Sequence, residues 1–96
     1  MEEKFMKEIR GMFESLHGLM RQNLPFWENE VDIIIANKET DRKKIEWTFD
    51  YLLDYTRHGI GSELYLRLIA YYRTVNPEGA ASYLQIYQEQ EDEENV

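Results

Sequence analysis

The stretch from Asp41 to His58, DRKKIEWTFDYLLDYTRH, has the spacing of an amphipathic helix. At about 100° per residue, four apolar side chains fall on one side of it: Ile45, Phe49, Leu52 and Leu53. A stripe of this width predicts a helix that buries one face in a core. Thr40 is a suitable N-cap, and Gly59 suits the residue that follows the last turn. We predict a helix here, around which the other segments pack.

The opposite side of this predicted helix carries two columns of side chains, each spaced by four residues. One column is aromatic and the other is acidic: Trp47, Tyr51 and Tyr55 stand beside Glu46, Asp50 and Asp54. Aromatic anchors beside charged groups are typical of binding surfaces. We predict that these six residues form a partner-binding or self-association surface. The alternative is a second buried face, on which the preceding segments pack.

The acidic column calls for compensating positive charge. Carboxylates four residues apart on a helix repel each other by about 0.2–0.5 kcal/mol per pair. Lys43, Arg57 or Arg67 could compensate for that repulsion within the chain. A basic surface on a partner could do so from outside, and the sequence leaves both alternatives open.

The remaining segments also favour helices, because two prolines and five glycines leave long uninterrupted runs. Residues 2–23 and 63–75 have apolar positions at helical spacing. Asn76, Pro77 and Glu78 are typical of a helix start, so a last helix begins there. In the first segment the positions expected to face the core are Phe5, Ile9, Met12, Phe13, Leu16 and Met20. We predict an all-α fold, a compact bundle of four to five helices.

The segment from Pro25 to Asn37 can be read in two ways. Its β-branched residues, among them Val31 and Ile33, suit a strand. A lone strand has no partner within the chain, however, so it would have to pair across a dimer axis. We predict a short separate helix that begins at Pro25, because the residue before a proline is pushed out of the α region.

The charge of the chain is strongly acidic, with 19 Asp and Glu against 11 Lys and Arg, or −8. Much of the excess lies in residues 89–96, which we predict to be a disordered acidic tail after a single helical domain of residues 1–88. Such a charge disfavours nucleic acid and anionic membranes as direct partners and favours a basic protein surface. No cysteine, signal peptide or membrane-spanning run is visible, so we expect a cytoplasmic protein.

Catalytic and metal-binding signatures are weak throughout the sequence. His17 and His58 are the two histidines, each lacks further ligands at metal-binding spacing, and we expect both to be surface side chains. Gly59-Ile60-Gly61 is not followed by the residues of a phosphate-binding loop and fits a helix end. A helix-turn-helix reading of the same region is disfavoured, because the second helix is mostly apolar. We therefore expect no enzyme activity, no metal and no cofactor.

Two blocks in the second half of the chain resemble known proteins. They are Ile45-Glu46 with Leu52-Leu53-Asp54-Tyr55, and the run YYRTVNPEGAASY from residue 71 to 83. Both are similar to small uncharacterised proteins of bacterial mobile elements, meaning phages and integrating conjugative elements. The resemblance assigns no functional residue. Such elements encode small, acidic, cysteine-free proteins that block host defence, including inhibitors of CRISPR-associated nucleases, and this chain is similar to those proteins in size and charge only.

These observations together predict a non-catalytic acidic binding protein. Its partner would be a basic protein surface, including that of a nucleic-acid-handling enzyme such as a CRISPR-associated nuclease. The alternatives are a self-associating homodimer of a mobile element and, third, a DNA-binding regulator.

Overall fold

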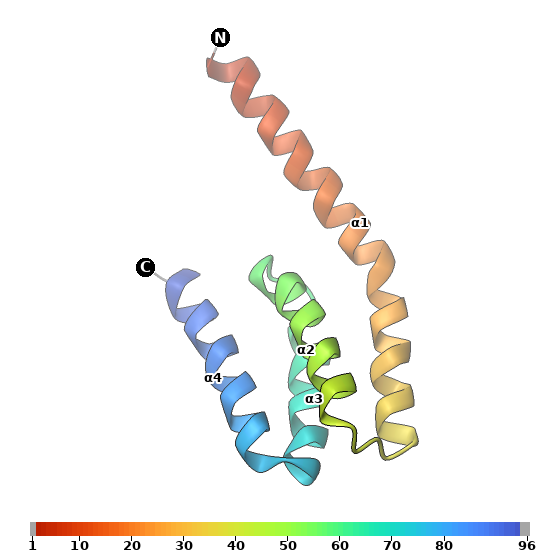
Figure 1. The fold of residues 1–96 in the computed structure, drawn as a ribbon. Helices are drawn as coiled ribbons and strands as arrows, with labels where there is room; N and C mark the ends of the chain where they lie inside the picture. Colours follow the sequence, from red (N-terminus) through yellow and green to blue (C-terminus); the bar gives the residue numbers. More distant parts are fainter. Residues whose placement is uncertain (1, 95–96) are drawn as a thin grey trace.

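The computed structural model describes residues 2–94, which form four α-helices and no strand (Figure 1). Their bounds are α1, Glu2–Ala36; α2, Arg42–Arg57; α3, Ser62–Val75; and α4, Pro77–Glu94. The predicted all-α fold is confirmed, with four helices. None of the described helices is long and apolar enough to cross a bilayer.

The helix α1 continues through Pro25. The predictions that a first helix ends before Pro25 and that a separate short helix begins there are therefore wrong. A proline inside a helix removes one hydrogen bond, clashes with the carbonyl four residues earlier and costs about 3 kcal/mol. The turns that follow offset this cost, because Trp27, Val31 and Ile34 are all buried. Proline also bends a helix, and α1 changes direction in its orange part in Figure 1. The alternative of a dimerising strand is wrong as well.

The ends of α2 and α3 are set by local hydrogen bonds and by glycine. Asp41, one residue later than the predicted cap, accepts the Lys43 N–H at 3.0 Å through its side chain. Gly59 and Gly61 have φ angles of +73° and +79°. A left-handed conformation at both positions favours glycine, so this pair turns the chain sharply from α2 into α3.

The stripe predicted for α2 is the centre of the core. Ile45, Phe49 and Leu52 have no exposed surface. The helix contacts α1, α3 and α4, and α3 and α4 run side by side in opposite directions (Figure 1). We call α2, α3, α4 and residues 20–36 of α1 the body.

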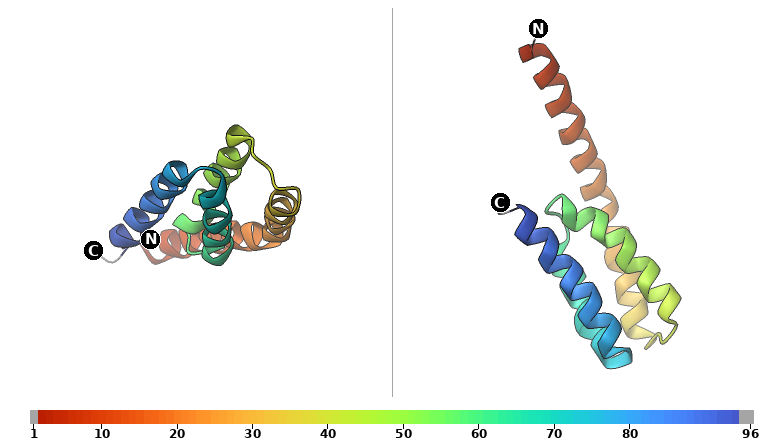
Figure 2. Two further views of the ribbon diagram at one scale, coloured as in Figure 1. Left: turned by 90° about the horizontal axis from the view of Figure 1, so that it is seen from below. Right: turned by 60° about the vertical axis from the view of Figure 1, so that its left-hand side comes forward.

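Residues 2–19 of α1 project from the body, and we call them the arm (Figures 1 and 2). The arm is helical as predicted, but its apolar stripe does not face a core. Phe5, Met12, Phe13, Leu16 and Leu19 are 41–71% exposed, and burial begins only at Met20. The cause is length: a helix of 35 residues extends roughly 52 Å, whereas one of 16 residues extends roughly 24 Å. The description "compact" therefore fits the body alone.

The C-terminal part of α4 also differs from expectation. The predicted disordered tail from residue 89 onward is not confirmed, because α4 is helical through Glu94. Residues 95–96 of that predicted tail lie outside the described residues. The boundary predicted at residue 88 therefore does not coincide with the end of a helix.

The corner between α3 and α4 is closed by a buried asparagine. The Asn76 side chain accepts the Gly79 N–H at 3.2 Å and donates to the Tyr72 hydroxyl at 3.1 Å. A Cβ added at Gly79 would lie 2.5 Å from Asn76 Nδ2 and 2.9 Å from Tyr72 Cε2. The corner therefore leaves no space for a larger residue at position 79.

Gly79→Ala should destabilise the body by about 1–3 kcal/mol, because the new methyl group would displace Asn76 or Tyr72. Gly18→Ala is the matched control. It lies in a helix with nothing within 4 Å of an added Cβ and should be neutral or stabilising by up to about 1 kcal/mol. Urea unfolding of both variants measures the difference, and equal effects would contradict the packing at this corner.

Candidate functional site

The predicted surface on α2 is connected to an aromatic cluster in the core, which is centred on Phe49 of the same helix. The ring of Phe49 stacks on Tyr83 with centroids 4.6 Å apart. It also meets Tyr65 and Tyr72 of α3 at 5.1 and 5.6 Å. These rings come from α2, α3 and α4, so the cluster fixes the three helices around one side chain.

The hydroxyls of these tyrosines need polar partners, and the acidic column of α2 supplies two of them. Tyr72 donates to the Glu46 carboxylate, and Tyr83 donates to Asp50 at 3.1 Å. Tyr65 instead donates to the Tyr83 carbonyl at 2.6 Å. Glu46 and Asp50 are therefore acceptors for tyrosine hydroxyls, a role that the spacing on α2 could not reveal.

Burial and these acceptors shift the titration of the tyrosines. Loss of solvation is the main cause that raises the pKa of Tyr65, Tyr72 and Tyr83. The hydrogen bond from Tyr83 to Asp50 adds to the effect, as does the one from Tyr72 to Glu46. A phenolate at either position would face a carboxylate, so the neutral phenol is the form that the fold holds.

The six predicted site residues differ in their exposure to solvent. Asp50 and Asp54 are exposed and Glu46 is half-buried. The structure buries Tyr55, which is 8% exposed. It leaves Trp47 and Tyr51 on the surface, at 51% and 45%.

Trp47 and Tyr51 belong to a second aromatic cluster, between α2 and α1. The buried ring of Trp27 stacks on Tyr51 at 4.9 Å and lies 5.7 Å from Trp47. Phe26 extends the cluster edge-on at 5.1 Å from Trp27 and is 55% exposed. The aromatic column thus holds the two helices together on one side and is open to solvent on the other.

The compensation expected for the acidic column takes a different form. Arg67 pairs with Asp32 of α1, outside the column. This is the one ion pair among the described residues. Tyrosine hydroxyls contact Glu46 and Asp50 in place of cations.

The last turns of α4 lie against the C-terminal half of α2. Thr56 donates to Gln90 Oε1 at 2.8 Å, and Gln90 Nε2 donates to the Leu53 carbonyl at 3.3 Å. Exposed carboxylates surround this contact in the sequence of α4: Glu89, Glu91, Asp92 and Glu93. The contact places these carboxylates at the same end of the body as Asp54.

The two histidines meet, which their separation of 41 residues concealed. His17 Nε2 and His58 Nδ1 are 3.2 Å apart, so one ring donates to the other. The contact joins the base of the arm to the end of α2. The described residues contain no group of three or more side chains that could hold a metal ion.

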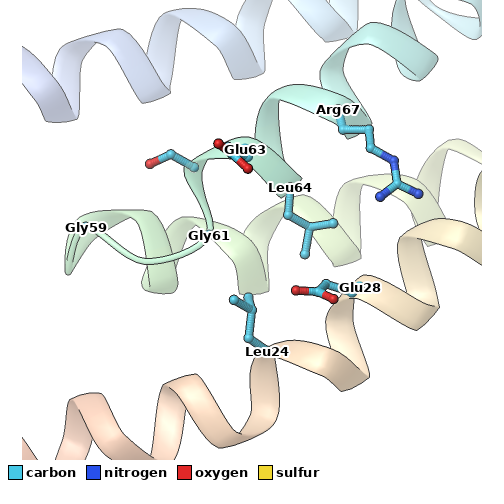
Figure 3. A pocket seen from close by; sticks show the side chains of 8 residues that line it. Leu24, Glu28, Gly59, Gly61, Glu63, Leu64 and Arg67 are labelled. Carbon is cyan, nitrogen blue, oxygen red and sulfur yellow. The ribbon is translucent and has the colours of Figure 1, made fainter.

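A shallow cleft of about 460 Å³ lies between α1 and the start of α3 (Figure 3). Leu24 and Glu28 of α1 face Leu64 across it, and Arg67 points toward α1 from α3. Its acidic side chains, Glu28 and Glu63, oppose the binding of an anion at the helix start. Arg67, the one basic side chain of the lining, pairs with Asp32, so the cleft lacks the net positive charge that a phosphate site needs.

No protein-family model matches this chain, and no curated protein and no solved structure shows significant similarity to it. The described residues present two surfaces, an acidic one where α2 and α4 end and an apolar one along the arm.

Raising the pH should destabilise the fold from about pH 10 upward. The unfolded chain ionises its tyrosines near 10.0, whereas the raised pKa values keep Tyr65, Tyr72 and Tyr83 neutral in the folded protein. The stabilisation is complete below that pH and declines as pH rises toward the folded pKa values. Phenolate absorbance and circular dichroism, followed together, should show these tyrosines ionising only as the helices unfold. Ionisation of all the tyrosines near pH 10 with the helices intact would contradict it.

Proposed function

We propose that this chain is a non-catalytic acidic binding protein whose body occupies a basic surface on a partner. One observation carries the proposal. From Thr74 to the end of the sequence there is no Lys or Arg, so α4 contains only acidic charged residues.

The position of these charges within α4 is unfavourable for the isolated helix. The C-terminal end of a helix dipole favours cations, by about 0.3–1 kcal/mol for each exposed charge. The last turns of α4 carry acidic residues in their place, and the last turn has no basic residue. Glu89 and Glu93 also repel each other, as carboxylates four residues apart do. A basic partner would relieve both costs.

The acidic surface is carried by an ordered helix, which supports the same proposal. The contacts of Gln90 with Leu53 and Thr56 hold the last turns of α4 against α2. The backbone that carries these carboxylates is already helical, so it loses less conformational entropy on binding than a flexible acidic tail would. With Asp54 at the same end, the surface resembles a short row of phosphates in charge.

A partner that matches such a surface has a basic groove, of the kind that a nucleic-acid-handling enzyme provides. Carboxylates would occupy the positions of phosphates and exclude the nucleic acid. A CRISPR-associated nuclease would provide such a groove, and this chain is similar in size and charge to the small acidic inhibitors of such nucleases. Self-association is the alternative. It is favoured by a different observation, the exposed apolar side chains of the arm.

The test is a pull-down from bacterial lysate with the full chain, at low and at high salt. A basic nucleic-acid-handling protein should be recovered at low salt and lost at high salt, since exposed charges are screened over about 8 Å at physiological ionic strength. Asp54→Lys with Asp92→Lys should reduce recovery at least tenfold.

The control reverses two exposed charges on the arm, Glu2→Lys with Glu3→Lys, and changes the net charge by the same amount. It should bind the partner as the unmodified chain does. Equal loss in both variants would show that only net charge matters, and recovery that resists high salt would contradict an electrostatic partner. Asp50 is left unchanged because it accepts the Tyr83 hydroxyl.

A further inference from the structure

The arm exposes a continuous apolar stripe, formed by Phe5, Ile9, Met12, Phe13, Leu16 and Leu19, which we call the arm stripe. Ile9 is half-buried and the others are 41–71% exposed. At roughly 200 Å² for a large side chain, the exposed fractions of the arm stripe amount to roughly 600 Å² per chain. Standard interfaces take roughly 600–1,000 Å² from each partner. The arm stripe is therefore large enough for a stable complex.

The arm stripe lies on the same face of α1 that packs on the body. Residues 11 apart on a helix differ by only about 20°. Phe5, Leu16 and Trp27 are spaced in this way, and so are Ile9, Met20 and Val31. Because Trp27, Met20 and Val31 are buried against the body, the arm stripe faces the side on which the body lies.

This placement decides how two arms can pair. In a parallel pair, the α1 helix of the second copy would run beside the first α1 in the same direction. Beyond the arm it would enter the space that the body of the first copy fills. In an antiparallel pair it runs away from the body. Phe5 and Leu19 are each seven residues from Met12, so an antiparallel pair centred on Met12 covers the arm stripe from end to end.

The charge of the arm supports a partner of the same kind. Its four acidic residues are nearly balanced by three basic ones: Glu2, Glu3, Glu8 and Glu14 against Lys4, Lys7 and Arg10. The arm thus carries a net charge of −1, and the remaining −7 belongs to the rest of the chain. Antiparallel arms centred on Met12 would keep the starts of the two acidic bodies roughly 24 Å apart, about three Debye lengths of about 8 Å.

We infer that the arm stripe is covered by the arm of a second copy of this chain, paired antiparallel about Met12. The arms form a two-fold symmetric interface, with one body at each end. This assembly is independent of the acidic surface proposed above.

Light scattering on the purified full chain should give twice the chain mass of 11.6 kDa at micromolar concentration. Met12→Glu with Leu16→Glu should weaken association at least a hundredfold. Leu66→Glu with Ile86→Glu is the matched control, because it adds the same charge at two apolar side chains that are each 40% exposed on the body. Its mass should stay that of the dimer.

Fluorescence of Trp27 and Trp47, which lie in the body, reports whether each variant remains folded. A monomeric parent chain at a few hundred micromolar would overturn the inference. So would a folded dimer of the Met12→Glu, Leu16→Glu variant. An arm that captures a different protein from lysate while the purified chain stays monomeric would likewise overturn it.

The absence of cysteine allows the orientation to be tested by disulfide formation. Met12→Cys should cross-link to itself on mild oxidation, whereas Phe5→Cys alone should not. A mixture of Phe5→Cys and Leu19→Cys chains should cross-link to a mixed dimer, whose mass distinguishes it from either homodimer. Efficient self-linking of Phe5→Cys would show a parallel pair and overturn the antiparallel arrangement.

Discussion

The contact of Phe49 with three tyrosine rings is the interaction on which the body depends. It unites α2, α3 and α4 through Tyr65, Tyr72 and Tyr83. Tyrosine brings a cost that phenylalanine does not, because each hydroxyl that leaves water needs an acceptor. Two acceptors are carboxylates of α2, and no buried side-chain nitrogen or oxygen among the described residues lacks a partner. The aromatic core and part of the acidic column are thus one structure.

The features that could be predicted from the sequence are those decided within a few residues. The α2 stripe at Ile45 and Phe49 follows from the helical period, and the role of Asn76 follows from its cap chemistry. The continuity of α1 at Pro25 was not predictable in this way. The local preference there is against a helix, and burial of residues from distant parts of the chain reverses it. Helical spacing likewise indicates that the arm stripe is apolar without showing what covers it.

The candidate site was predictable in part for the same reason. The period places Trp47 and Tyr51 on one side of α2, and both are half exposed. It places Tyr55 on that side too, yet Tyr55 is buried, because exposure depends on which helices lie over each turn. The pairing of His17 with His58 had no signal in the sequence, since neither the spacing nor the neighbours of either residue indicate it.

The two surfaces of this chain, the arm stripe and the acidic end of the body, differ in the kind of interaction that they can make. The arm is apolar with a net charge of −1, so pairing of the arms should depend little on salt. The proposed binding by the acidic end of the body would act through charge and should weaken as salt rises. In one assembly, the paired arms would form a rod with an acidic body at each end. If one body bound a partner that has two basic sites, the effective concentration of the second body at the second basic site would rise. A stiff arm pair fixes that distance, so it would select partners by the spacing of their sites as well as by their charge.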